Sequence, residues 1–184
     1  MKSVVLMLAD GFEEMEAVIL ADVLRRAGFK VSLVSVTGRK GVTGSHGIRM
    51  EADLLFGDAD FGEVDLVVLP GGMPGAAHLN THEGLRQLLP SILEDGKLVG
   101  ALCAAPMVLG NLGLLKGKRA TCYPGFEKYL HGAVWSGEAV VSDGQVVTAN
   151  GAGAALPFAL RLVEVLADRE SAVQTARKMM VPGY

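Results

Sequence analysis

One cysteine stands where an apolar strand is expected to turn into a helix. Residues 97–102 have the composition of an interior strand and Cys103 follows them. Pro106 suits the first turn of the next helix, because its missing amide proton has no partner there. Backbone amides and the positive end of a helix dipole at such a turn favour the thiolate over the thiol. Cys103 is therefore the candidate nucleophile. The alternative role is that of a small buried hydrophobic side chain, which is our interpretation of Cys122 in another predicted strand.

Two further segments contain groups that a nucleophilic cysteine needs. The tripeptide Pro70-Gly71-Gly72 follows an apolar strand, and its glycines let backbone amides point into a site and form an oxyanion hole. An ordinary strand-ending turn is the alternative. Glu16 precedes the apolar stripe of the first predicted helix, so its side chain is expected to point toward the strand ends. A carboxyl group in an apolar pocket has a raised pKa and acts as an acid or base. The alternative for Glu16, as for Glu13 and Glu14, is a surface charge at a helix N-terminus.

The histidines and glycines do not form the usual cofactor motifs. Only His78 and His82 have a spacing suited to one metal ion, and the polar segment around them lacks a cysteine or carboxylate pattern. The sequence contains no P-loop, and no dinucleotide-binding fingerprint follows the first strand. We therefore expect neither a metal nor an organic cofactor.

The composition is that of a well-buried globular protein. The chain has 184 residues, half of them hydrophobic, and this length favours one domain over residues 1–184. Its net charge is -3 and it contains no basic run, which disfavours a nucleic-acid partner. No apolar stretch approaches the roughly 18 residues of a membrane span. The first residues suit a strand better than a signal peptide, and two cysteines without a disulfide framework favour a reducing, cytoplasmic setting.

Strand and helix patterns alternate along the chain. Strands are predicted at residues 4–9, 30–36, 64–69, 97–102 and 119–122, with a hairpin over 138–149 and a possible antiparallel excursion over 42–53. Helices are predicted at residues 13–27, 83–94, 105–112, 155–166 and 171–180. Apolar strands separated by helices indicate a doubly wound α/β domain with a parallel sheet covered on both faces.

The topology predicts where the candidate residues meet. In such folds ligands bind beyond the carboxyl ends of the strands. Four informative segments follow predicted strands, at residues 10–16, 70–75, 103–106 and 150–153. We therefore expect these segments to converge on one site.

The first predicted helix has a second apolar side. Met15, Val18, Ile19 and Val23 lie away from the stripe that faces the sheet, so the helix needs a further partner. We expect a symmetric homodimer through Met15, Val18 and Ile19.

Taken together, the motifs resemble those of the DJ-1/ThiJ/PfpI superfamily, closest to its DJ-1/ThiJ branch. The resemblance rests on residues 8–16, 67–72, 101–106 and 151–153, which occur in family order and at family spacing across essentially the whole chain. It implies a flavodoxin-like, doubly wound and mostly parallel sheet sandwiched by helices, as in class I glutamine amidotransferases, and usually a homodimer.

The resemblance also implies roles for particular residues. Cys103 matches the family's oxidation-prone nucleophile and Glu16 its acidic partner, while the amides of Gly72 and Ala104 match its anion-stabilising pair. Activities attributed to members include cofactor-independent glyoxalase, protein deglycase, chaperone and oxidative-stress sensor.

Five positions around this pattern affect the functional interpretation. PfpI-type peptidases have a histidine directly after the cysteine, where this chain has Ala104, so peptidase activity is disfavoured. Tyr123 replaces a histidine of some members, and His46 and Asn150 replace arginines, whereas Arg26 is retained. A smaller positive field disfavours an acidic or phosphorylated substrate.

Three hypotheses follow from the sequence. The first is a cysteine-dependent, cofactor-free conversion of small reactive aldehydes such as methylglyoxal, with possible protein deglycase activity. The second is an oxidative-stress sensor or redox-regulated chaperone that uses the same cysteine. The third, a cysteine hydrolase or amidotransferase-like enzyme, needs a histidine that none of the four evidently provides.

Overall fold

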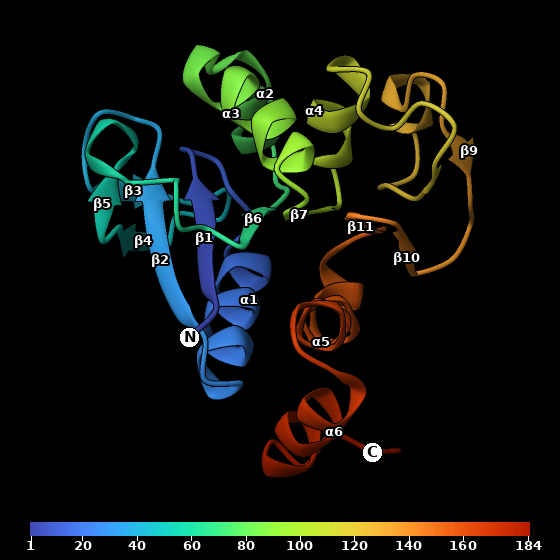
Figure 1. Cartoon of the computed structure of the whole chain (residues 1–184). Helices are drawn as coiled ribbons and strands as arrows, with labels where there is room; N and C mark the ends of the chain where they lie inside the picture. The colour runs from blue at the N-terminus through green and yellow to red at the C-terminus, as the bar shows by residue number, and fades with distance from the viewer.

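A seven-stranded sheet forms the centre of the computed structural model, which describes all 184 residues (Figure 1). The strand order is β10-β11-β7-β6-β1-β2-β5, and only β10 is antiparallel to its neighbour. The strands are β1 Ser3–Leu8, β2 Lys30–Ser35, β5 Leu54–Leu55, β6 Leu66–Leu69, β7 Leu98–Leu102, β10 Val140–Asp143 and β11 Val146–Ala149. This mostly parallel sheet between helices confirms the predicted flavodoxin-like α/β class.

Helices cover both faces of the sheet. One layer contains α1 (Glu14–Arg26), α5 (Ala155–Leu166) and α6 (Arg169–Lys178), and the other contains α2 (Gly75–Thr81), α3 (Glu83–Glu94) and α4 (Pro106–Asn111) (Figure 1). Successive side chains of β1 point to opposite faces, so Val4 and Leu6 join the core under α1 and α5 while Val5 and Met7 join the other core. The sheet is therefore apolar on both sides.

Short elements complete the chain. An antiparallel pair, β3 (Gly41–Thr43) and β4 (Arg49–Glu51), confirms the predicted excursion, and β8 (Arg119–Ala120) pairs in parallel with β9 (Val134–Trp135). Three 3₁₀ turns lie at Phe56–Asp58, Glu127–Tyr129 and Ala152–Ala154. No helix has the length and apolar character needed to cross a membrane.

Two local expectations are wrong. The predicted strand over 119–122 is only two residues long, and Cys122 lies beyond it, although buried as expected. Val23 was placed on the free side of the first helix, but its side chain is buried, and Ile19 is half-buried against the same core. The cause is α5, which packs beside α1 and covers a wider part of it than the sheet alone does. Helix α2 was not predicted.

Candidate active site

Cys103 occupies an elbow between β7 and α4. Its backbone has φ 62°, a left-handed conformation that is uncommon for a residue other than glycine. Two hydrogen bonds hold it there: the Cys103 N–H donates to the Ala149 carbonyl (2.9 Å), and the Cys103 carbonyl accepts from the Tyr123 N–H (2.8 Å). The elbow leaves the thiol half-buried at the carboxyl end of the sheet.

Gly71 brings a second strand end against the elbow. A Cβ atom at Gly71 would lie 2.5 Å from the Cys103 Cβ and 3.0 Å from the Ala104 nitrogen, so only glycine fits without displacement. The Gly71 N–H donates to Oε2 of Glu16 at 2.6 Å. The ends of β6 and β7 and the first turn of α1 therefore meet at one point, as the topology predicted.

Glu16 is fully buried at this meeting point. Burial raises its pKa from 4.5 to about 7, although the Gly71 N–H and the neighbouring Cys103 thiol favour the charged form. Its second carboxylate oxygen, Oε1, is buried and has no hydrogen-bond partner in the protein. Near neutral pH this carboxyl group is therefore able to gain or release a proton.

The thiol itself differs from expectation. Burial and the negative charge of Glu16 raise the pKa of Cys103 to about 12, and hydrogen bonds from the Gly72 and Ala104 amides only partly oppose this. The elbow amides are where the sequence placed them, but the predicted preference for a free thiolate is wrong. The sequence argument omitted the nearby carboxylate, whose charge favours a protonated thiol.

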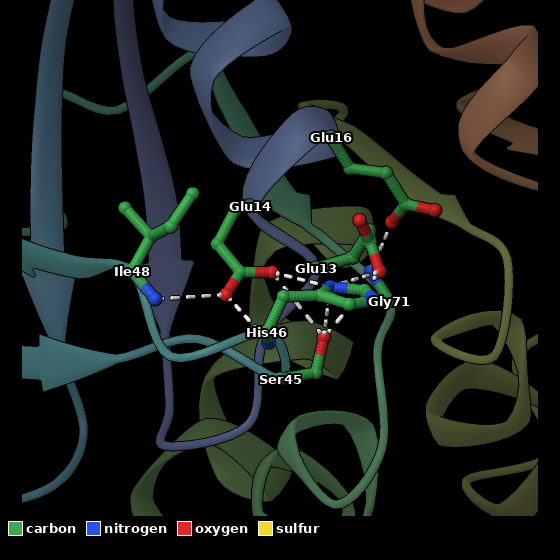
Figure 2. A network of polar contacts seen from close by, with 7 residues as sticks. All are labelled: Glu13, Glu14, Glu16, Ser45, His46, Ile48 and Gly71. Carbon is green, nitrogen blue, oxygen red and sulfur yellow. Dashed lines mark hydrogen bonds and ion pairs between the residues drawn. The ribbon is translucent and has the colours of Figure 1, made fainter.

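Glu14 forms a second polar cluster on the outer side of the same helix turn (Figure 2). Oε1 accepts hydrogen bonds from the backbone of His46 (2.7 Å) and Ile48 (3.3 Å), and Oε2 accepts from Ser45 Oγ (3.3 Å) and contacts His46 Nδ1 (2.9 Å). Burial alone would raise the pKa of Glu14, but these hydrogen bonds outweigh it and lower the pKa to about 2. In return, the contact with Glu14 raises the pKa of His46. Glu14 thus fixes the β3–β4 loop to α1, a role the sequence analysis missed.

One group of side chains has donor atoms close enough to hold a metal ion. Ligand atoms of Glu13, Glu14 and His46 lie within 4.8 Å of one another. Both oxygens of Glu14 already accept hydrogen bonds from the protein, so the geometry serves loop attachment.

Tyr123 and Asn150 are two of the remaining candidates for residues that line the site. The backbone of Tyr123 is bonded to Cys103, and its half-exposed ring lies beside Gly151. Asn150 follows β11, next to the end of β7, and its N–H donates to the Ala139 carbonyl.

Arg26 is not brought to the site within this chain. It lies ten residues beyond Glu16 on α1, roughly 15 Å along the helix axis, and pairs with Asp22 at 2.6 Å. The helix therefore places Arg26 far from Cys103, and the prediction that Arg26 lines the site within one chain is wrong. His46 lies at the near end of α1, in the Glu14 cluster.

Comparison with known proteins agrees with this geometry. The model of the DJ-1/PfpI family matches residues 2–165. The chain belongs to the DJ-1/PfpI family. A solved structure described as oxidized DJ-1 of Toxoplasma gondii shares 35% of the sequence with a TM-score of 0.95, covering 99% of this chain and all of that one.

Some relatives of this chain are more than twice as long as the chain itself. It is 40% identical over 98% of its length to two Arabidopsis thaliana proteins, named Protein DJ-1 homolog B and homolog A. It spans only 42% and 47% of their lengths. A protein named deglycase from Pyrococcus abyssi (strain GE5 / Orsay) is 32% identical over 89% of this chain and 98% of its own.

Proposed function

We propose that this DJ-1/PfpI protein converts small 2-oxoaldehydes such as methylglyoxal into hydroxy acids, using Cys103 as the nucleophile. The observation that carries the proposal is Glu16, a buried carboxyl group with a pKa of about 7 beside the thiol. The reaction needs a proton to leave one carbon and reach its neighbour, and a group with a pKa near the working pH does this best. The relative named deglycase supports carbonyl chemistry in the family.

The first step joins the substrate to the protein. Since the pKa of the thiol is raised to about 12, the thiol reacts as ionised Glu16 accepts its proton while sulfur attacks the aldehyde carbon. The amides of Gly72 and Ala104, which point at the sulfur, are placed to bind the oxyanion that forms. The proton that Glu16 took from the thiol passes to that oxygen, which gives a hemithioacetal and returns Glu16 to the carboxylate form.

Glu16 then moves a proton between carbons. As a carboxylate it takes the proton from the former aldehyde carbon, giving an enediolate with its charge on the former ketone oxygen. The hydroxyl proton of the former aldehyde oxygen passes to the former ketone oxygen, and Glu16, now an acid, returns its proton to the adjacent carbon. The product is a thioester of lactate on Cys103, and water hydrolyses it to lactate and the free thiol. The unpartnered Oε1 leaves one oxygen of Glu16 available for this transfer. Tyr123, whose backbone is bonded to Cys103, and Asn150, next to the end of β7, are the proposed site-lining residues.

Lactate formation tests this proposal. Purified protein is incubated with methylglyoxal in the absence of glutathione, and lactate is measured directly. We expect lactate from the wild type, none above background from Cys103→Ser, and wild-type rates from Cys122→Ser, the control thiol. An active Cys103→Ser variant would disprove the cysteine mechanism.

Redox sensing by the same thiol is a second candidate. The half-buried Cys103 lies against a carboxyl group that, when protonated, can donate a hydrogen bond to a sulfinate. The similar Toxoplasma gondii protein has been solved in a form described as oxidized. Mild peroxide followed by mass spectrometry should add two oxygens to Cys103 before Cys122. The sensor becomes the leading candidate when this occurs and no lactate forms, and oxidation of Cys122 first would reject it.

We also propose a homodimer through the exposed side of α1. Met15 and Val18 are 56% and 50% exposed, and Ile48, whose N–H is bonded to Glu14 at the start of this helix, is 58% exposed. Ile19 contributes less than its spacing suggested, because it is half-buried in the core of its own chain. Sedimentation should show a dimer at micromolar concentration that Val18→Glu dissociates. A monomeric wild type would contradict the proposal.

A further inference from the structure

A large cleft lies away from Cys103. It has a volume of about 830 Å³ and is lined mainly by residues of β10, α5 and α6, which Figure 1 draws in orange and red. None of the residues assigned above to the candidate site lines it. Its volume is within the range of small-molecule sites, roughly 300–1,000 Å³.

Arginines are concentrated around this cleft. Four of the nine arginines in the sequence line it, and none of the eight lysines does; the four are Arg119, Arg161, Arg169 and Arg177. The chain as a whole has a net charge of -3, so this cluster runs against the overall charge. The planar guanidinium fork matches the geometry of carboxylates and phosphates, which suggests oxyanions as the groups that bind here.

Two of these arginines have partners within the chain. Arg161 pairs with Glu164 (3.0 Å) and donates from Nε to Ser142 Oγ (2.9 Å), while Arg119 pairs with Glu138. The two glutamates that line the cleft are thereby matched by two arginines. Arg169 and Arg177 have no ion pair in the chain, so their positive charges remain available.

The free arginines flank an apolar stretch of α6. Arg169, Ala172, Val173 and Arg177 follow at intervals of three, one and four residues, which places them on one face of the helix. The two arginines are eight residues apart, or roughly 12 Å along the axis. Leu160 of α5 also lines the cleft, so apolar side chains are present among its arginines.

We propose that this cleft binds an elongated organic anion, with carboxylate or phosphate groups held by Arg169 and Arg177 and an apolar portion between them. A bare inorganic ion would make no contact with the apolar side chains of the lining. The proposal is independent of the chemistry assigned to Cys103, because it shares no residue with that site.

Titration calorimetry with two probes tests the proposal. Sebacate, a straight-chain dicarboxylate, represents the carboxylate source, and ADP represents the phosphate source. We expect saturable binding of at least one probe at low-millimolar concentration or below, with inorganic sulfate binding more weakly. Binding of one probe alone supports the site and identifies its anion, whereas no saturable binding of either would overturn it.

Adjacent residues of α6 provide a matched pair of variants. Arg177 lines the cleft and Lys178 does not, yet both are exposed and each carries one positive charge. Arg177→Gln should weaken binding about tenfold, as expected for a lost charge-assisted hydrogen bond, and Arg169→Gln should act similarly. Lys178→Gln should change affinity less than about twofold. Equal losses in Arg177→Gln and Lys178→Gln would contradict a built site.

Discussion

Two glutamates in the first turn of α1 have pKa values shifted in opposite directions. Glu14 and Glu16 are separated by one residue and both are buried. The pKa of Glu14 is lowered to about 2, whereas the pKa of Glu16 is raised to about 7. Burial raises the pKa of both carboxyl groups, and it does so more strongly at Glu16, which lies deeper in the protein, so burial accounts for part of the difference.

Hydrogen-bond donors account for the rest of the difference. Glu14 receives donors on both oxygens from the β3–β4 loop, and they stabilise its charge (Figure 2). Glu16 receives one strong donor, from Gly71, and keeps one oxygen unpartnered. One carboxylate is therefore suited to hold a loop in place, and the other to exchange protons near neutral pH.

The largest expected difference between the two is in catalysis. Glu16→Gln removes the group that moves the proton and should lower kcat/KM for lactate formation by about 10² to 10⁴-fold. Glu14→Gln should lower it less than about tenfold, since that residue acts on the loop. Initial rates at matched protein concentration give both values. Similar losses in the two variants would contradict the division of roles.

The two glutamates should also affect stability with opposite dependence on pH. The folded pKa of Glu16, about 7, exceeds its ordinary 4.5, so the stabilisation present below pH 4.5 is lost as pH rises through 7. Glu16→Gln should therefore gain stability relative to the wild type with rising pH, by up to about 3 kcal/mol.

For Glu14 the sign is reversed. Its folded pKa of about 2 lies below 4.5, so its contribution is present above pH 4.5 and is lost as pH falls toward 2. Glu14→Gln should be less stable than the wild type at neutral pH, and the difference should shrink on acidification. Urea unfolding across this pH range measures both slopes, and parallel curves would reject the assignment.

The next largest effect is expected from a substitution at Gly71, which lies against the Cys103 elbow. Gly71→Ala places a methyl group 2.5 Å from the Cys103 Cβ and should cost about 1–3 kcal/mol of unfolding free energy. Gly153→Ala is the control, because a Cβ there meets nothing within 4 Å and φ is not positive. Urea unfolding of the two variants should separate them. A well-tolerated Gly71→Ala would show that the strand ends are less tightly joined than described.

The smallest effect is expected at the second cysteine. Burial and the charge of Glu127 raise the pKa of Cys122 to about 11, and the pKa of Cys103 is raised as well, so exposure rather than ionisation separates the two thiols. Iodoacetamide should therefore modify half-buried Cys103 well before Cys122, which is 3% exposed. Peptide mass spectrometry after brief labelling measures this order, and faster labelling of Cys122 would contradict it.

The sequence predicted the fold and the meeting of strand ends because both follow from periodicity. Alternating apolar strands and helices require a covered parallel sheet, and its carboxyl ends bring Gly71, Cys103 and Glu16 together. The position of Glu16 beside the apolar stripe of α1 allowed both a buried carboxyl group with a raised pKa and a surface charge, and the structure shows the buried form.

The rest depends on contacts between distant segments. Glu14 resembles a surface charge in the sequence, because its partners lie more than thirty residues away in the β3–β4 loop. The residue type of Arg26 does not show that it lies away from the site. Its distance follows only from the length of α1, because Arg26 is the last residue of that helix and Glu16 lies in the first turn. The raised pKa of Cys103 likewise depends on where the carboxyl group of Glu16 lies relative to the sulfur.

The central claim is that Glu16 titrates near neutral pH beside Cys103. Carbon-13 NMR of side-chain carboxyl groups, assigned with Glu16→Gln and Glu14→Gln, measures this directly. The structure predicts a midpoint near 7 for Glu16 and near 2 for Glu14. A Glu16 midpoint at or below its ordinary 4.5 would contradict the account, because the carboxyl group would then be fully ionised where the proposed proton transfer needs both forms.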